Sequence, residues 1–192
     1  MTGKERVLRA IEHRGPDRVP LLSPVPALSD FFYIAQYPAS DWQPKPGYGP
    51  NLHRILYLIG NWKWNAFTPE KLFKGWLLRE DEFGCIWEAP EPENVGEVNG
   101  HPLSDISQFA SMELPDPHRP ERFETFGKLT KILGKDKFIL GDIGNGLGER
   151  TRFLRGFEGI MEDYALRPDA VGEMMDRLID EWYLGLVEEL AD

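Results

Sequence analysis

The longest hydrophobic pattern lies near the end of the chain. Apolar residues from Val171 to Leu190 recur at spacings of three and four, which predicts a long amphipathic helix. Thr2 and Glu5 form the Thr-x-x-Glu pattern of a capping box, so a second helix is expected to begin at the start of the chain. Shorter helical patterns cover residues 28–37, 51–59, 122–133 and 157–164, and Ser104 and Asp105 begin another short helix.

Short apolar runs predict buried strands between these helices. Val19–Leu22, Trp62–Phe67 and Lys137–Gly141 are the three candidates, and Lys137–Gly141 has the clearest pattern. The run at 19–22 does not alternate with polar residues, which is typical of a parallel sheet covered on both faces. Strands that alternate with helices predict an α/β fold.

Residues 76–101 follow a different pattern. Strand-like pieces at Trp76–Arg79, Cys85–Trp87 and Val95–Val98 are separated by acidic or Gly/Pro/Asn turns. This spacing favours an antiparallel β-hairpin insertion over a helix. We expect residues 1–192 to form a single domain that carries this insertion.

Composition narrows the function classes. The 192 residues carry a formal net charge of −10, which argues against a nucleic-acid partner because such proteins usually carry a basic face. There is no apolar run near the ~18 residues that a membrane span needs, so no membrane partner is expected. Met1–Arg14 lacks the pattern of a secretory signal peptide. Cys85 is the single cysteine, which excludes an internal disulfide and favours a reducing, cytoplasmic location.

Four groups of short motifs occur along the chain in a characteristic order. They are Lys4–Ile11 followed by Pro16–Pro20; Asp81-Glu82-Phe83-Gly84 with Trp87; His101-Pro102-Leu103; and Leu154-Arg155-Gly156-Phe157-Glu158 with Asp163 and Pro168. Their order and spacing resemble the uroporphyrinogen decarboxylase superfamily, whose fold is a TIM-type (β/α)8 barrel. Such a barrel typically needs ~250 residues, so the resemblance implies the N-terminal half of a barrel with a hairpin insertion.

The superfamily contains two chemistries, and the resemblance favours one of them. The decarboxylases hold substrate carboxylates with an Arg-Gln-Ala-Gly-Arg segment after the first strand, whereas Leu22–Leu28 contains no arginine. Arg152 also stands where the family has a substrate-contacting tyrosine. The other branch comprises corrinoid-dependent methyltransferases, which use zinc held by His-x-Cys and a distant Cys in the C-terminal half. No His-x-Cys occurs here, so no metal ligands are expected in this chain. Zinc and a corrinoid protein are implied only if the C-terminal half is supplied.

The candidate site follows the Lys137–Gly141 strand, because barrel enzymes place their chemistry at the carboxyl ends of strands. Asp142 is the candidate catalytic residue, although it can equally cap a turn. Ser23, Asn145, Arg150 and Arg152 are the candidate substrate-binding residues. The two arginines can grip an anionic substrate or form surface ion pairs, and exposed charge is the more common case.

The other polar and aromatic groups have simpler explanations. Gly144-x-Gly146-x-Gly148 lacks the spacing of a dinucleotide loop and is expected to form a sharp turn. The four histidines lack metal-ligand spacing and are expected to be solvent-exposed. Cys85 is expected to pack in the core. The acidic run Glu80–Glu82 is expected to be solvated. The tryptophans can line a pocket for a planar ligand or pack in the core.

Two hypotheses about function remain. The first is a methyltransferase-related enzyme half that acts on a small methylated compound and is inactive alone. The second is a non-catalytic binding or assembly module formed by a split or truncated barrel; porphyrinogen decarboxylation is the less favoured third reading. An open barrel edge predicts self-association or pairing with a C-terminal half, with Val171, Met175 and Trp182 near the covered surface.

Overall fold

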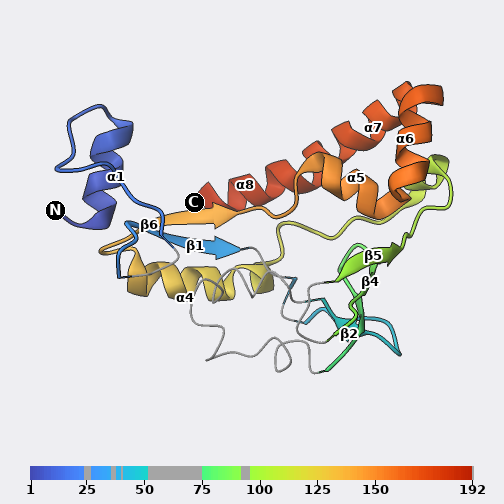
Figure 1. Cartoon of the computed structure of the whole chain (residues 1–192), viewed down its shortest axis with the longest axis horizontal. Helices are drawn as coiled ribbons and strands as arrows, with labels where there is room; N and C mark the ends of the chain where they lie inside the picture. Colours follow the sequence, from blue (N-terminus) through green and yellow to red (C-terminus); the bar gives the residue numbers. More distant parts are fainter. Residues whose placement is uncertain (24–26, 36–37, 40, 52–74, 92–95, 192) are drawn as a thin grey trace.

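The computed structural model describes residues 1–23, 27–35, 38–39, 41–51, 75–91 and 96–191. The described part is a mixed α/β structure with two small sheets and no closed barrel. A two-stranded sheet lies at the end of the molecule that holds α1, and a four-stranded sheet lies at the opposite end with α5, α6 and α7 (Figure 1). The predicted helix at 51–59 and strand at Trp62–Phe67 lie largely or wholly outside the described residues.

The first helix, α1 (Gly3–Ile11), begins with the predicted capping box. The Glu5 N–H donates to Thr2 Oγ1 at 3.1 Å, and the Thr2 N–H donates to Glu5 Oε2 at 2.9 Å. These two bonds satisfy amide donors that the helix itself leaves free. One turn of sequence thus suffices to fix where the helix begins.

The first strand of the two-stranded sheet is β1 (Phe31–Ala35), where a helix had been expected, and Val19–Leu22 is an exposed loop. Pro20 has no amide hydrogen, and the backbone of Leu21 is bound to Asp30: its N–H donates to Asp30 Oδ2 at 2.8 Å and its carbonyl accepts from the Asp30 N–H at 2.8 Å. The predictions of a strand at 19–22 and a helix at 28–37 were therefore wrong. The aromatic and β-branched sequence of β1 suits a pleated surface.

The second strand of this sheet is β6 (Phe138–Asp142), which confirms the strand predicted at Lys137–Gly141. It pairs with β1 in parallel, from Phe31 opposite Phe138 to Ala35 opposite Asp142. Helix α4 (Glu124–Leu133) precedes β6 and ends at Gly134, close to the predicted bounds. Because the pairing with β1 is direct, any further strand of this sheet must join at an outer edge.

The predicted antiparallel hairpin is confirmed. Strands β3 (Leu78–Glu80), β4 (Ile86–Glu88) and β5 (Glu97–Gly100) form an antiparallel meander. The short strand β2 (Gly49–Pro50) adds to β3 in parallel. A 3-10 helix, η1 (Ile106–Ser111), follows with Asp105 as its cap, and a second one, η2 (Pro120–Arg122), leads into α4.

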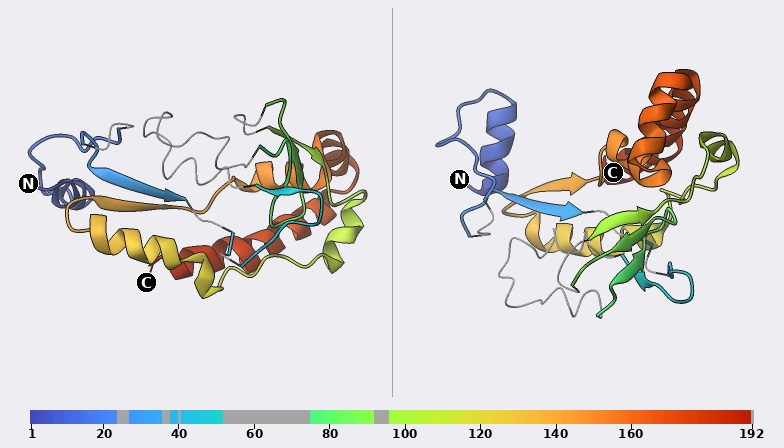
Figure 2. Two further views of the ribbon diagram at one scale, coloured as in Figure 1. Left: turned by 90° about the horizontal axis from the view of Figure 1, so that it is seen from below. Right: turned by 45° about the vertical axis from the view of Figure 1, so that its right-hand side comes forward.

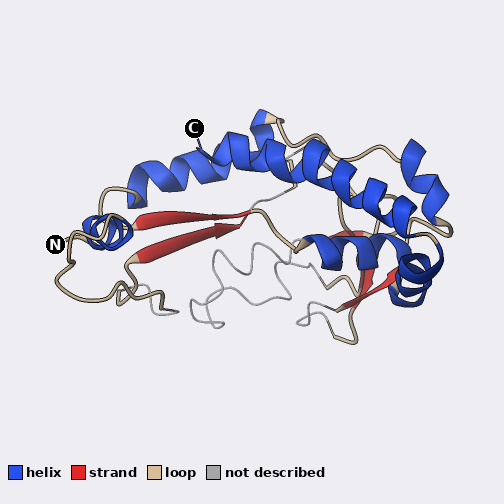
Figure 3. Cartoon of the chain, turned by 90° about the horizontal axis from the view of Figure 1, so that it is seen from above, coloured by secondary structure: helices blue, strands red, loops and turns tan. Residues whose placement is uncertain are grey.

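The C-terminal helical run spans the molecule and connects its two ends. After α5 (Leu147–Arg155) and α6 (Phe157–Leu166), α7 (Pro168–Leu178) continues through a π-helical turn, η3 (Ile179–Tyr183), into α8 (Leu184–Ala191). The long helix extends from the hairpin sheet to the β1–β6 sheet (Figures 2 and 3). The prediction of a long helix over 171–190 is confirmed, except that one of its turns is π-helical.

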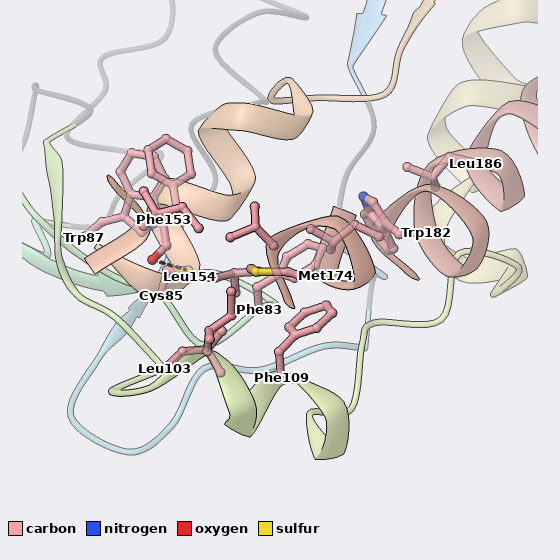
Figure 4. Packing of buried hydrophobic residues seen from close by; sticks show 14 residues of the cluster. Phe83, Cys85, Trp87, Leu103, Phe109, Phe153, Leu154, Met174, Trp182 and Leu186 are labelled. Carbon is pink, nitrogen blue, oxygen red and sulfur yellow. Dashed lines mark hydrogen bonds between the residues drawn. The ribbon is translucent and has the colours of Figure 1, made fainter. Parts of the chain in front are cut away.

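The main hydrophobic core lies where this long helix, α5 and the hairpin meet. Fourteen buried residues form one cluster, and Trp87, Phe153, Met174 and Trp182 are among them (Figure 4). Trp87 packs edge-on against Phe153 with ring centroids 5.1 Å apart. The apolar stripe predicted to be uncovered is part of this core, since Val171 is 2% exposed and Trp182 is fully buried. The placement of these two residues at a surface open to a partner was therefore wrong.

Candidate functional site

Asp81 is the polar centre of the hairpin. Its Oδ1 accepts hydrogen bonds from the backbone N–H groups of Phe83 (3.0 Å) and Cys85 (2.9 Å). Its Oδ2 accepts from Trp87 Nε1 and from Arg150 Nη1, both at 3.2 Å. Four donors from the hairpin and from α5 thus converge on one carboxylate, which holds the two elements together.

The side chain of Arg150 is buried, whereas a surface position had been the more common expectation. Its side chain is 2% exposed, and its guanidinium lies 3.9 Å from the centroid of the Phe83 ring. Burial opposes the charged form and is the largest single influence, but the negative surroundings, with Asp81 first among them, together outweigh it, so the pKa of Arg150 lies above its ordinary value. Arg150 therefore forms a buried ion pair that links α5 to the hairpin.

The rest of the acidic run is also buried, so the prediction that it is solvated was wrong. Glu80 bonds to both the backbone N–H and the ammonium of Lys45, the latter at 3.0 Å, and Glu82 pairs with Arg122 at 2.6 Å. Each carboxylate of the run therefore has a cationic partner from a distant part of the chain. Buried charges are tolerated when they are paired in this way.

The junction of α5 and α6 carries a second set of contacts. His101 Nδ1 lies 2.8 Å from the carbonyl oxygen of Phe153, and the Leu103 N–H donates to the Leu154 carbonyl at 3.0 Å. Gly156 joins the two helices with φ +82° and ψ 154°, a region open essentially only to glycine. A Cβ at Gly156 would lie 3.0 Å from the His101 ring. The absence of a side chain therefore lets the imidazole lie against the helix junction.

Between the hairpin and α5 lies a cavity of about 450 Å³, here named the hairpin–helix cavity. The hairpin side of its wall consists of Trp87, Gly96, Glu97, Val98 and His101. The helical side consists of Asn145, Glu149, Arg152, Phe153 and Phe157. The cavity thus combines three aromatic rings with two carboxylates, one guanidinium, one imidazole and one amide. Half of the lining residues are polar or charged, so the cavity offers several hydrogen-bonding groups beside its aromatic side chains.

No protein-family model, curated protein or solved structure matches this chain. The function must therefore be argued from the cavity and from the residues around it.

The structure brings two of the predicted site residues together. Asn145 and Arg152 both line the hairpin–helix cavity, Asn145 from the loop after β6 and Arg152 from α5. The Tyr183 hydroxyl donates to the Asn145 carbonyl at 2.6 Å and so fixes this loop to the long helix. Arg152 is exposed, with its guanidinium 5.1 Å from the centroid of the Phe153 ring.

The other predicted residues lie elsewhere. Asp142 ends β6, where its Oδ1 accepts from the Gly144 N–H at 2.8 Å, which is the turn-capping role that the sequence left open. The Ser23 N–H lies 3.3 Å from Ser29 Oγ, just before β1 begins. Since a strand rises ~3.3 Å per residue, the length of β1 separates Ser23 from Asp142. These two residues cannot share a site.

Three residues of the cavity escaped the sequence argument. His101 had been assigned to an exposed loop; it is exposed, but its Nδ1 is fixed against Phe153. Glu97 was not considered, and Glu149 had been considered only as a charge that complements a helix N-terminus. The signal that could have identified His101 was its position between the last predicted strand, Val95–Val98, and Pro102. Its partner, 52 residues away, could not be found from local sequence.

A zinc ion does not fit the described residues. No group of three or more His, Cys, Asp or Glu side chains in the described ranges could hold a metal ion. The Cys85 thiol is buried and donates to the Phe153 carbonyl at 3.5 Å (Figure 4). Burial raises the pKa of this thiol well above its ordinary value, which disfavours the thiolate that a metal would need. No helix of the described part is long and apolar enough to span a bilayer.

Proposed function

We propose that this chain is the N-terminal half of a TIM-type barrel similar to uroporphyrinogen decarboxylase, from the branch related to corrinoid-dependent methyltransferases. Its role is to bind a small methylated compound in the hairpin–helix cavity, while a C-terminal half supplies the zinc ligands and meets the corrinoid protein. The observation that carries the proposal is the position of this cavity. It is lined by Asn145, Glu149 and Arg152, where β6 leads into α5, and parallel α/β folds bind ligands at the carboxyl ends of their strands.

The contacts among the motifs support the resemblance. The segment Asp81–Trp87 binds α5 through Arg150, and His101–Leu103 binds the turn at Leu154–Gly156. Three segments that are far apart in the sequence therefore meet around one cavity. A chain that kept these motifs in order would keep this arrangement of hairpin and helices. The single cysteine supports a cytoplasmic location for the protein.

The test is a binding experiment on the full chain. Backbone ¹H–¹⁵N spectra are recorded with 4-methoxybenzoate, methylthioacetate or N,N-dimethyl-2-phenylethylamine at up to about 10 mM, since a Kd of ~1 mM corresponds to only ~4 kcal/mol. At least one probe is expected to shift the amides of Asn145, Glu149 and Glu97. Asn145→Ala should weaken the binding of that probe. Arg9→Gln, a substitution at an exposed position on α1, should leave the binding unchanged. The absence of any localised shift for all three probes would overturn the proposal.

The second candidate is a non-catalytic assembly module. It is favoured by the apolar side chains that α6 leaves in solvent, since Phe157 is 63% and Met161 52% exposed. Under this reading the chain associates with a second copy or with a C-terminal half. Light scattering at micromolar concentration should then give at least twice the 22.0 kDa of one chain. A stable mass of one chain would refute self-association.

A further inference from the structure

The hairpin–helix cavity carries an excess of negative charge. Glu97 on β5 and Glu149 on α5 contribute two carboxylates, whereas Arg152 contributes a single guanidinium. Glu149 and Arg152 are also three residues apart on α5, where side chains are neighbours, so the guanidinium offsets the charge of Glu149. Glu97 lies on the opposite wall and is exposed to solvent, and a cationic ligand in the cavity can pair with it.

His101 adds a further acceptor. A carbonyl oxygen can only accept a hydrogen bond, so the bond to Phe153 at 2.8 Å places the hydrogen of the neutral imidazole on Nδ1. The Nε2 atom then carries a lone pair, and the ring is exposed at the cavity. A ligand that hydrogen-bonds to Nε2 of the neutral ring must therefore present a donor.

The aromatic walls are compatible with a cation. Phe157 is 63% exposed, whereas Trp87 and Phe153 pack against each other and are buried, so Phe157 is the ring that a ligand in the cavity can reach most fully. Aromatic faces attract organic ammonium groups through the ring quadrupole and also cover the apolar part of such a molecule. The volume of about 450 Å³ lies within the range of ordinary small-molecule sites.

We propose that the hairpin–helix cavity binds a small organic ammonium compound, with its nitrogen near Glu97 and His101 and its apolar part against Phe157. This inference rests on the proposed small-molecule site and specifies the chemical class of its ligand. A simple anion does not fit as well, because it would meet two carboxylates and an imidazole lone pair for each guanidinium.

The experiment compares two probes of similar shape and opposite charge on the full chain. 2-Phenylethylamine and 3-phenylpropanoate are titrated while the amides of Glu97, Asn145 and Arg152 are followed by NMR. The amine should bind with shifts localised at these amides, and the acid should bind about twofold to fivefold more weakly, which is the range for one exposed ion pair. Glu97→Gln should weaken the binding of the amine by up to about fivefold. Glu162→Gln, an exposed change on α6, is the matched control and should have no effect.

Arg152→Gln gives the sharpest discrimination because it removes a positive charge from the cavity. Binding of the amine should become stronger by about twofold to fivefold. Weaker amine binding in this variant, or tighter binding of the acid than of the amine by the unmodified chain, would overturn the inference while leaving a small-molecule site in place. If neither probe binds, the inference also fails. The proposed function is then decided separately, by the methoxy and methylthio probes.

Discussion

Replacing Asp81 with asparagine should be among the most damaging isosteric changes in this protein. The substitution keeps the shape of the side chain but removes its charge, and it leaves Arg150 buried without an anion. One amide oxygen can still accept from the N–H groups of Phe83 and Cys85. The amide nitrogen must then face Trp87 Nε1 and Arg150 Nη1, which are themselves donors.

The expected loss can be taken from the burial of the pair. The side chains of Arg150 and Asp81 are 2% and 12% exposed, and breaking a buried ion pair costs ~3–5 kcal/mol. A domain of this size has ~5–15 kcal/mol of stability in total. Asp41→Asn is the matched control, because the Asp41 side chain, paired with Arg119, is 55% exposed. Such a surface pair contributes only ~0–1 kcal/mol.

Urea denaturation followed by circular dichroism and tryptophan fluorescence measures both variants. A double-mutant cycle with Arg150→Met then separates the ion pair from other effects, since removing both charges should recover part of the loss. A coupling of ~1–3 kcal/mol is expected for residues in direct contact. The reasoning would be refuted if Asp81→Asn cost no more than Asp41→Asn, or if the losses in the cycle were additive.

Three further predictions concern single residues. Gly156→Ala should lower the free energy of unfolding by ~1–3 kcal/mol, measured by denaturation, because φ is +82° and the new Cβ meets the His101 ring. Gly148→Ala is the control and should be neutral or stabilising, because open space surrounds that position. Equal effects of the two substitutions would contradict this account. The hydrogen bond from Arg6 lowers the pKa of Asp17 from 3.8 to about 2, so the stability that it contributes is fully present above pH 3.8 and is lost as pH falls towards 2. Asp17→Asn should therefore flatten that part of the acid unfolding profile, and an unchanged profile would count against the ion pair. Cys85 should react with a thiol reagent at pH 8 only as fast as the protein unfolds, because its thiol is buried with a raised pKa; rapid labelling of the folded protein would show that it is accessible.

The features that could be predicted from the sequence are those fixed by near neighbours. The capping box needs only Thr2 and Glu5, three residues apart. The hairpin follows from turn residues and short strands, and the long helix follows from a repeat of apolar positions. Gly134 also ends α4 as expected. Each of these patterns depends only on residues that are close together in the sequence.

The errors arise where a distant residue decides the outcome. Asp30 forms hydrogen bonds with both the N–H and the carbonyl of Leu21, so these groups are not available for pairing in a sheet. The acidic run is buried because Arg150 and Arg122 come from 69 and 40 residues away. Asn145 and Arg152, which the sequence singled out because they follow a strong strand, line the same cavity. Sequence patterns missed His101, since its partner Phe153 belongs to another element.

The π-helical turn in the long helix bears on how this chain tolerates insertions and deletions. Within it the Leu184 N–H donates to the Ile179 carbonyl, five residues back, so the turn accommodates more residues than an α-helical turn does. Buried Met174, Leu178, Trp182 and Leu186 are spaced by four, a repeat that would wind around a regular helix of 3.6 residues per turn. Deleting one residue between Ile179 and Tyr183 would let this turn close as an α-helical turn and keep the register downstream, whereas a deletion in a regular part of the helix would rotate everything downstream by roughly 100°. The helix that joins the two sheets should therefore tolerate a one-residue deletion in this turn better than a deletion elsewhere along its length.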